Sequence, residues 1–71
     1  MKAYRVAGCS MRFIEGENPH LCCVVELQHK ESGDLYHYHR DFARTTRGAF
    51  LCGIDLSRFL SGRTPHGWEL R

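Results

Sequence analysis

Two runs of alternating apolar and polar residues lie at the centre of the chain. In the first run the odd positions are apolar, whereas the even positions change from apolar to polar along the run. The odd set is Leu21, Cys23, Val25 and Leu27, and the even set is Cys22, Val24, Glu26, Gln28 and Lys30. A period of two over this length predicts a half-buried strand. The second run, LYHYHRDF at 35–42, follows a turn signal at Ser32 and Gly33, so the sequence predicts a hairpin from His20 to Phe42.

The predicted turn fixes the pairing of the two strands, because a two-residue and a four-residue loop around Ser32 and Gly33 give the same register. On one face Leu27 is expected opposite Tyr38, Val25 opposite Arg40 and Cys23 opposite Phe42. On the other face Gln28 is expected opposite His37, Glu26 opposite His39 and Val24 opposite Asp41. The first face is apolar and aromatic, and the second is polar and rich in histidine. A slip of one residue would mix the two faces, so the pattern favours this pairing.

Residues 3–14, AYRVAGCSMRFI, predict a strand whose alternation changes phase at Gly8. The apolar positions are Tyr4 and Val6 before this point and Ala7, Cys9, Met11 and Phe13 after it. A bulge or bend at the glycine would bring both apolar sets to the same core. The following EGENP at 15–19 is a loop by composition.

The chain after the hairpin allows two interpretations. ARTTRG at 43–48 has no apolar periodicity and predicts a basic loop. For 49–61, AFLCGIDLSRFLS, we prefer a strand over residues 49–54 and then a short helix that Asp55 caps and Gly62 ends. The alternative is one helix from about Thr46 to Ser61, because the apolar residues of this segment also fit a helical stripe.

The expected fold is a single small α+β or mostly β domain that spans residues 1–71. It would contain an antiparallel sheet of four to five strands and one short helix near the C-terminus. Trp68, Glu69 and Leu70 are expected to form a short closing strand, with Trp68 as a large anchor of the core or of its edge. This order of elements fits a small SH3-like barrel, and it equally fits an open α+β sheet with a helix on one face.

Charge is small overall and unevenly distributed along the chain. The formal net charge is +2 and the pI about 8.5, which is too mild to indicate a dedicated polyphosphate binder. Residues 1–39 hold four basic and five acidic side chains, whereas residues 40–71 hold six basic and three acidic. Eight of the ten cations are arginine, which favours bidentate contacts with carboxylate or phosphate.

Four cysteines, at positions 9, 22, 23 and 52, could form two disulfides in a secreted protein. The first ten residues lack a long apolar stretch, so we expect a cytoplasmic protein with reduced cysteines. Cys22 and Cys23 are neighbours on one predicted strand and point to opposite faces, which argues against a bridge between them. No apolar run approaches the roughly 20 residues of a membrane span, and we expect no membrane partner.

The polar face of the predicted hairpin carries a metal-binding hypothesis. His37 and His39 share this face, with Glu26 opposite and Asp41 beyond. Two imidazoles and a carboxylate can hold zinc or another divalent ion. The alternative, which we favour, is a solvated sheet face that carries histidines and needs no cofactor.

Nucleophilic catalysis has weaker support in the sequence. Cys22 is expected on the same face as Glu26 and His39, but no local signature of a catalytic cysteine accompanies it. A chain of 71 residues also leaves little room for a pocket that excludes water. The sequence therefore predicts a non-enzymatic protein.

Protein binding fits the remaining features best. A compact domain with an arginine-rich loop and a polar hairpin face would act by covering a surface of a partner. Many small inhibitors carried by phages and other mobile elements, including some anti-CRISPR proteins, have this size and lack of motif. The predicted contact residues are Arg40, Arg44, Arg47, Arg63 and Tyr36. Pairing of exposed edge strands would also allow a homodimer, because it would enlarge a small core.

A nucleic-acid-binding module is the second hypothesis. The same arginines would contact phosphates, and Tyr36 or Tyr38 would stack on bases. Against this hypothesis, Tyr36, Tyr38 and Arg40 lie on the face that the pattern assigns to the core. Solvated surface charge explains scattered arginines equally well.

Overall fold

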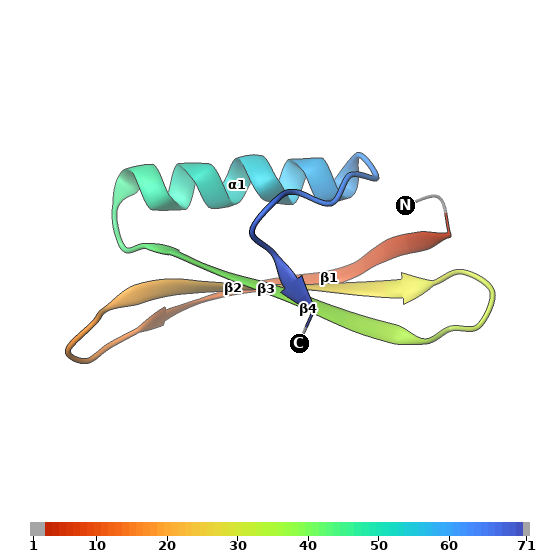
Figure 1. The fold of residues 1–71 in the computed structure, drawn as a ribbon, viewed down its shortest axis with the longest axis horizontal. Coiled ribbons are helices and arrows are strands. Elements are labelled where there is room, and N and C mark those ends of the chain that lie inside the picture. The colour runs from red at the N-terminus through yellow and green to blue at the C-terminus, as the bar shows by residue number, and fades with distance from the viewer. Residues whose placement is uncertain (1–2, 71) are drawn as a thin grey trace.

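The computed structural model describes residues 3–70 and contains four strands and one helix. In chain order the elements are β1 (Tyr4–Ile14), β2 (His20–His29), β3 (Leu35–Ala43), α1 (Thr46–Leu60) and β4 (Glu69–Leu70). The strands form one antiparallel sheet in the order β1-β2-β3-β4, and α1 lies across one of its faces (Figure 1). This confirms the predicted small antiparallel sheet with one helix. The sheet is open and not a barrel, because β1 and β4 are its two edges.

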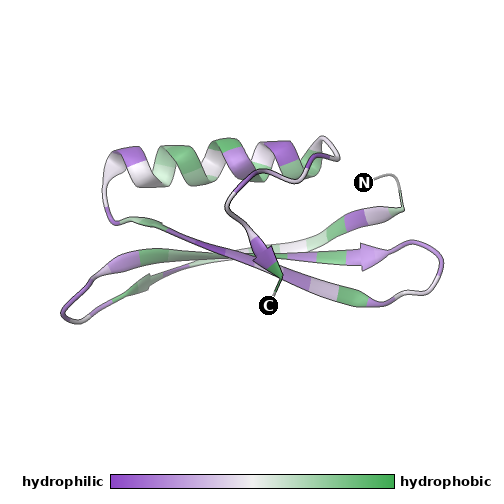
Figure 2. Cartoon of the chain, in the orientation of Figure 1, coloured by the Kyte–Doolittle hydropathy of each residue, from purple (hydrophilic) through white to green (hydrophobic). Residues whose placement is uncertain are grey.

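β2 lies at the centre of the core, and its alternation is the one that the sequence predicts. The odd-numbered side chains from Leu21 to Leu27 are at most 2% exposed, and the even-numbered ones from Cys22 to Gln28 are half-buried. Cys52 and Phe59 of α1 cover the odd set, together with Phe42 of β3 and Trp68. Bands of hydrophobic and hydrophilic residues accordingly alternate in α1 and in the strands, while the β2–β3 connection is hydrophilic (Figure 2).

The predicted bulge in β1 is present. It moves the core-facing positions of the strand from even to odd residue numbers, as predicted. The β1–β2 register shifts between Val6 and Gly8, so that Ala7 is an extra residue in the strand. Val6 lies opposite Leu27 before the shift, and Cys9 lies opposite Val25 after it. The apolar residues on both sides of the bulge therefore face α1.

The β2–β3 register differs from the prediction by two residues. The structure pairs Leu27 with Tyr36, Val25 with Tyr38, Cys23 with Arg40 and Leu21 with Phe42. The turn is centred one residue earlier than predicted, because the His29 N–H bonds the Asp34 carbonyl and the His29 carbonyl accepts from Gly33, both at 2.9 Å. The ring Nδ1 of His29 also accepts from the backbone of Glu31 and Ser32, which stabilises the turn in this position. Because the shift is even, each side chain keeps its predicted face.

The predicted strand over residues 49–54 is wrong, and the alternative of one continuous helix is the observed structure. α1 begins after Thr45, whose hydroxyl accepts from the Gly48 N–H at 3.0 Å as an N-cap. The predicted basic loop is consequently shorter, because it contributes its second half to the first turn of α1. Gly62, with φ of +85°, ends the helix region as predicted.

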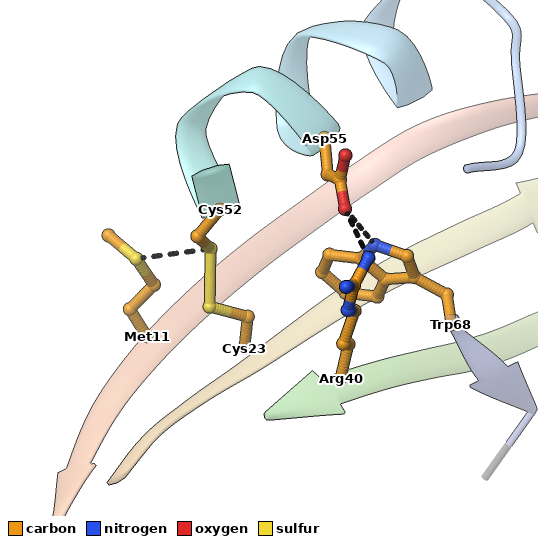
Figure 3. Close-up of a disulfide and its surroundings, with 6 residues drawn as sticks. All are labelled: Met11, Cys23, Arg40, Cys52, Asp55 and Trp68. Carbon is orange, nitrogen blue, oxygen red and sulfur yellow. Dashed lines mark hydrogen bonds and ion pairs between the residues drawn. A yellow bond between two sulfur atoms is a disulfide. The ribbon is translucent and has the colours of Figure 1, made fainter. Parts of the chain in front are cut away.

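Asp55 is not a helix cap but a buried hub in the middle of α1. It is 5% exposed, and its Oδ2 accepts from Arg40 Nη1 at 3.0 Å and from Trp68 Nε1 at 2.9 Å. Its Oδ1 accepts from Arg58 Nη1 at 3.1 Å. Figure 3 shows the Arg40 and Trp68 donors converging on one carboxylate oxygen from two different segments of the chain. The carboxylate therefore ties α1 to β3 and to the C-terminal segment, where Trp68 packs on Phe59 as the predicted core anchor.

A disulfide joins Cys23 of β2 to Cys52 of α1, and both residues are fully buried (Figure 3). This contradicts the expectation that all cysteines are reduced. Met11 of β1 adds a third sulfur, with its Sδ 3.5 Å from the Cys52 Sγ. Cys9 and Cys22 are free thiols, so Cys22 and Cys23 are not bridged to one another, as predicted. Sulfur contacts thus hold the first half of α1 to the sheet, and the Asp55 hub holds the second half.

Candidate functional site

The face of the sheet opposite α1 is a continuous polar surface, which we call the open face. No element within residues 3–70 covers it (Figure 1). Its members follow from the observed registers and the alternation of strand side chains. They are Arg5, Gly8, Ser10, Arg12 and Ile14 of β1, His20, Cys22, Val24, Glu26 and Gln28 of β2, and Leu35, His37, His39, Asp41 and Ala43 of β3.

Gly8 opens a shallow hollow in the open face. It lies opposite Glu26, and a Cβ built at Gly8 would meet no atom within 4 Å. The hollow has a volume of about 400 Å³. Its lining residues are Gly8, Cys9, Ser10, Arg12, Ile14, Cys22, Val24, Glu26 and His37. The same glycine that accompanies the bulge thus shapes the other face of the strand as well.

Cross-strand pairs order the side chains of the open face. His37 Nε2 and Glu26 Oε2 are 2.9 Å apart, and His20 Nε2 and Asp41 Oδ2 are 3.7 Å apart. Arg5 donates from Nε to Gln28 Oε1 at 3.0 Å at the far end of the face. Because the partners sit on neighbouring strands, these pairs hold polar atoms in fixed positions on a rigid sheet.

The four predicted metal ligands are not brought together. The two-residue shift of register places Glu26 opposite His37, whereas the prediction placed it opposite His39. His39 lies instead between Val24 and Glu69, and Asp41 lies opposite Cys22. Among residues 3–70 there is no group of three or more His, Cys, Asp or Glu side chains arranged to hold a metal ion. The metal hypothesis depended on the predicted register, in which the turn is centred on Ser32 and Gly33.

The predicted partner-binding residues are spread over the molecule. Arg40 points to the α1 side, where it bonds Asp55 and donates to the His66 carbonyl at 2.8 Å. Tyr36 is half-buried on the same side against the ring of Tyr4. Both residues therefore serve the fold, and the arginine is not part of an exposed basic loop.

Two of the predicted arginines do lie close together in the chain at one corner of the molecule. Arg44 follows β3 and donates to Glu15 at 3.0 Å, with its guanidinium 5.4 Å from the centre of the Phe13 ring. Arg47 is exposed in the first turn of α1. Arg63 is exposed as well, but it follows α1 at the opposite end of the helix.

Sequence reasoning missed Arg5 and Arg12 as members of the open face. Arg12 lies opposite Cys22 and lines the hollow, and Arg5 lies opposite Gln28. The signal was present, because the phase change at Gly8 assigns odd positions after it to the core and so leaves Arg12 on the polar face. The two arginines balance the carboxylates of Glu26 and Asp41 on this surface.

Comparison of the chain with protein-family models, curated proteins and solved structures found no match. Within the described residues, no helix has both the length and the apolar composition needed to cross a membrane. The geometry of the open face is therefore the basis on which a function can be argued.

Proposed function

We propose that the chain is a small non-enzymatic binding protein that inhibits or masks a protein partner by covering it with the open face. The observation that supports this most directly is that no element within residues 3–70 covers one side of the sheet. Antiparallel sheets commonly leave one face to solvent, but here that face carries polar side-chain pairs across the strands and a hollow of about 400 Å³. A rigid, preorganised surface loses little conformational entropy when a partner covers it.

The charges of the open face favour a protein over a nucleic acid as the partner. Arg5 and Arg12 are accompanied by Glu26 and Asp41, so the surface is of mixed sign and not a cationic track. Mixed charge is typical of the polar parts of protein–protein interfaces, where complementary pairs select the partner. Arg44 and Arg47 lie at a corner on the α1 side of the sheet, so they would attract an acidic partner at long range and would not contact it at the open face.

The aromatic residues also lie on the wrong side for nucleic-acid stacking. Tyr36 and Tyr38 are paired with Leu27 and Val25, which are core residues, and so point toward α1. Binding to single strands relies on exposed rings on which bases stack. This placement supports the protein-binding proposal over the nucleic-acid alternative.

Affinity capture from the native host with a Val24→Arg variant tests the proposed surface. Val24 lies in the middle of the open face, opposite Ser10 and His39, and is half-buried there. An arginine at this position would add bulk and an unpaired charge to the interface, and we expect loss of the captured partner. Ser57→Arg on the exposed outer side of α1 is the matched control, and it should retain the partner.

Two further arms of the capture experiment separate the alternatives. Recovery of the same partner at the same yield with Val24→Arg, while the variant is folded, would show that the open face is the wrong surface. A double charge reversal, Arg44→Glu with Arg47→Glu, tests the corner independently. Capture that disappears after nuclease treatment and weakens steeply with salt would favour the nucleic-acid alternative, because phosphate contacts release counterions.

A further inference from the structure

β1 is an edge strand, and the direction of its outer backbone groups can be assigned. In an antiparallel ladder, successive residues point their N–H and C=O alternately to the two neighbouring strands. His29 bonds toward the β3 side, to Asp34 and Gly33, whereas Lys30 bonds the carbonyl of Ala3 on the β1 side. The backbone N–H and C=O groups of odd-numbered β2 residues therefore point toward β3, and those of even-numbered residues point toward β1.

The same alternation identifies which β1 residues have outward-pointing backbone groups. Ser10 and Arg12 are paired with the even residues Val24 and Cys22, so they bond inward to β2. The outward set is Cys9, Met11 and Phe13, which are paired with Val25, Cys23 and Leu21. No described strand lies beyond β1 to receive these groups.

The side chains of the outward set are apolar and largely exposed. Met11 is 53% exposed, Phe13 is 62% exposed, and Cys9 is also exposed. All three lie on the α1 side of the sheet, and none is charged. The stretch from Gly8 to Ile14 has no further register shift and contains no proline, and its one charged side chain, Arg12, lies on the open face and away from the apolar set.

The exposed area of the chain is larger than a compact monomer of its mass requires. The accessible surface is 5158 Å², whereas the scaling for monomeric proteins gives about 4,500 Å² for this mass. The excess is about 660 Å², somewhat below the roughly 800 Å² that each partner contributes to a standard protein–protein interface. Its extents of 42 × 20 × 16 Å also describe a long, narrow body with an extended side.

We propose that the β1 edge is the interface of a symmetric homodimer, in which β1 pairs antiparallel with β1 of a second copy. A two-fold axis perpendicular to the sheet would pass between the two Met11 residues. Met11 would then lie opposite its own copy, and Cys9 would lie opposite Phe13 of the other chain. This register gives every outward N–H and C=O of Cys9, Met11 and Phe13 a partner.

Self-complementarity is the reason for choosing a second copy as the occupant. A register centred on Met11 aligns the whole regular stretch from Gly8 to Ile14 with itself, whereas a centre moved toward Tyr4 runs into the bulge at Ala7. The thioether and thiol would contact aromatic rings on the α1 side, which is a favourable combination. On the open side Arg12 would face Ser10, so the like charges are not directly opposed.

Amide hydrogen exchange on the unaltered protein tests this directly. In the dimer, the amides of Cys9, Met11 and Phe13 are protected together with those of Ser10 and Arg12, and the protection of the first three falls on dilution. In a monomer, only Ser10 and Arg12 are protected. Light scattering should accordingly give twice the chain mass of 8.2 kDa at high concentration. A single-chain mass at the solubility limit, with rapid exchange of the three outward amides, would overturn the proposal.

A Met11→Pro variant removes one outward N–H while leaving the β1–β2 ladder intact, because that N–H does not face β2. We expect a monomer with the circular dichroism of the unaltered chain. Met11→Val keeps the N–H and is the matched control, and it should remain a dimer. A folded Met11→Pro variant that stays dimeric would contradict the proposal. Val24→Arg should leave the dimer unchanged, so failure of the open-face function and failure of the dimer are distinguishable.

Discussion

At the β4 edge, the chain turns back after α1 and places Trp68 over the core, whereas at the β1 edge no described segment does so. Trp68 is 7% exposed, but Met11 and Phe13 on the other side are 53% and 62% exposed. The closed side is held by one buried carboxylate with three donors from different segments. The difference indicates that hydrogen bonds to Asp55 close the core on the β4 side, whereas apolar side chains on the β1 side are exposed and available for contact.

The largest expected effect comes from breaking the closed side with Asp55→Ala. The substitution would leave the Trp68 N–H and the Arg40 guanidinium without their acceptor, and we expect a loss of about 3–5 kcal/mol in the free energy of unfolding. A domain of this length is expected to have only about 4–11 kcal/mol in total. Urea denaturation followed by tryptophan fluorescence measures the loss.

Arg58→Ala is the matched control for the hub. Its side chain is 53% exposed and donates to the other carboxylate oxygen of Asp55. Exposed ion pairs contribute about 0–1 kcal/mol, so this variant should remain nearly as stable as the unaltered chain. Equal losses for Asp55→Ala and Arg58→Ala would show that the buried Arg40 and Trp68 bonds do not dominate.

Reduction of the Cys23–Cys52 disulfide has the next largest expected effect. The bridge closes a loop of 29 residues, for which the chain-entropy relation gives about 3.6 kcal/mol of stabilisation. Urea midpoints with and without reductant measure it, with a Cys9→Ser and Cys22→Ser double variant as the background that excludes other pairings. Identical midpoints, or two alkylated thiols in the unfolded double variant without reductant, would contradict the assigned bridge.

Smaller effects, of opposite sign, are expected at the two glycines of α1. A Cβ at Gly48 would collide with the backbone of Ala43, so Gly48→Ala should destabilise by about 1–3 kcal/mol or more. Gly53 meets no atom within 4 Å, and Gly53→Ala should stabilise by about 0.5–1 kcal/mol through helix propensity. Thermal denaturation of both variants tests this. Equal shifts of the melting temperature would contradict the close packing at Gly48 and the open space at Gly53.

The smallest expected effect is at Leu60, which is 74% exposed at the end of α1 beside Tyr4 and Val6. Leu60→Gln should change stability by less than about 0.5 kcal/mol. Phe59→Ala, one residue earlier and 2% exposed, should cost about 3–5 kcal/mol. A large effect at Leu60 in dilute solution would mean that the β1 side is more closely packed than the described structure.

The alternation of strand side chains and the face that each one occupies were predictable, because both depend on the local pattern of apolar and polar residues. The alternation of β2 and the phase change at Gly8 identified the buried face and the bulge. The strand predicted at 49–54 was wrong because Asp55 resembles a cap locally. Its actual partners, Arg40 and Trp68, are 15 and 13 residues away in the chain, so no local pattern indicates them.

The candidate site was predictable to the same degree. Membership of the polar face depends on parity and was correct for Glu26, His37 and His39. The pairs across the strands depend on the position of the turn, which His29 fixes by accepting hydrogen bonds from the backbone of Glu31 and Ser32. Arg40 was assigned to a partner because its internal acceptor is made by tertiary packing.

The extra residue in β1 determines how changes in chain length would be tolerated. Deletion of Ala7 would remove the bulge and leave a regular strand, in which Val6 would still lie opposite Leu27 and Arg5 opposite Gln28, so both faces would be kept. An insertion in the loop at 15–19 would leave both faces as they are, because hairpin loops absorb additional residues at the surface. Changes in length should therefore be accepted after Ile14 and at Ala7, whereas deletion of one residue from the regular stretch between Cys9 and Phe13 would turn the side chains on one side of the deletion to the opposite face of the sheet.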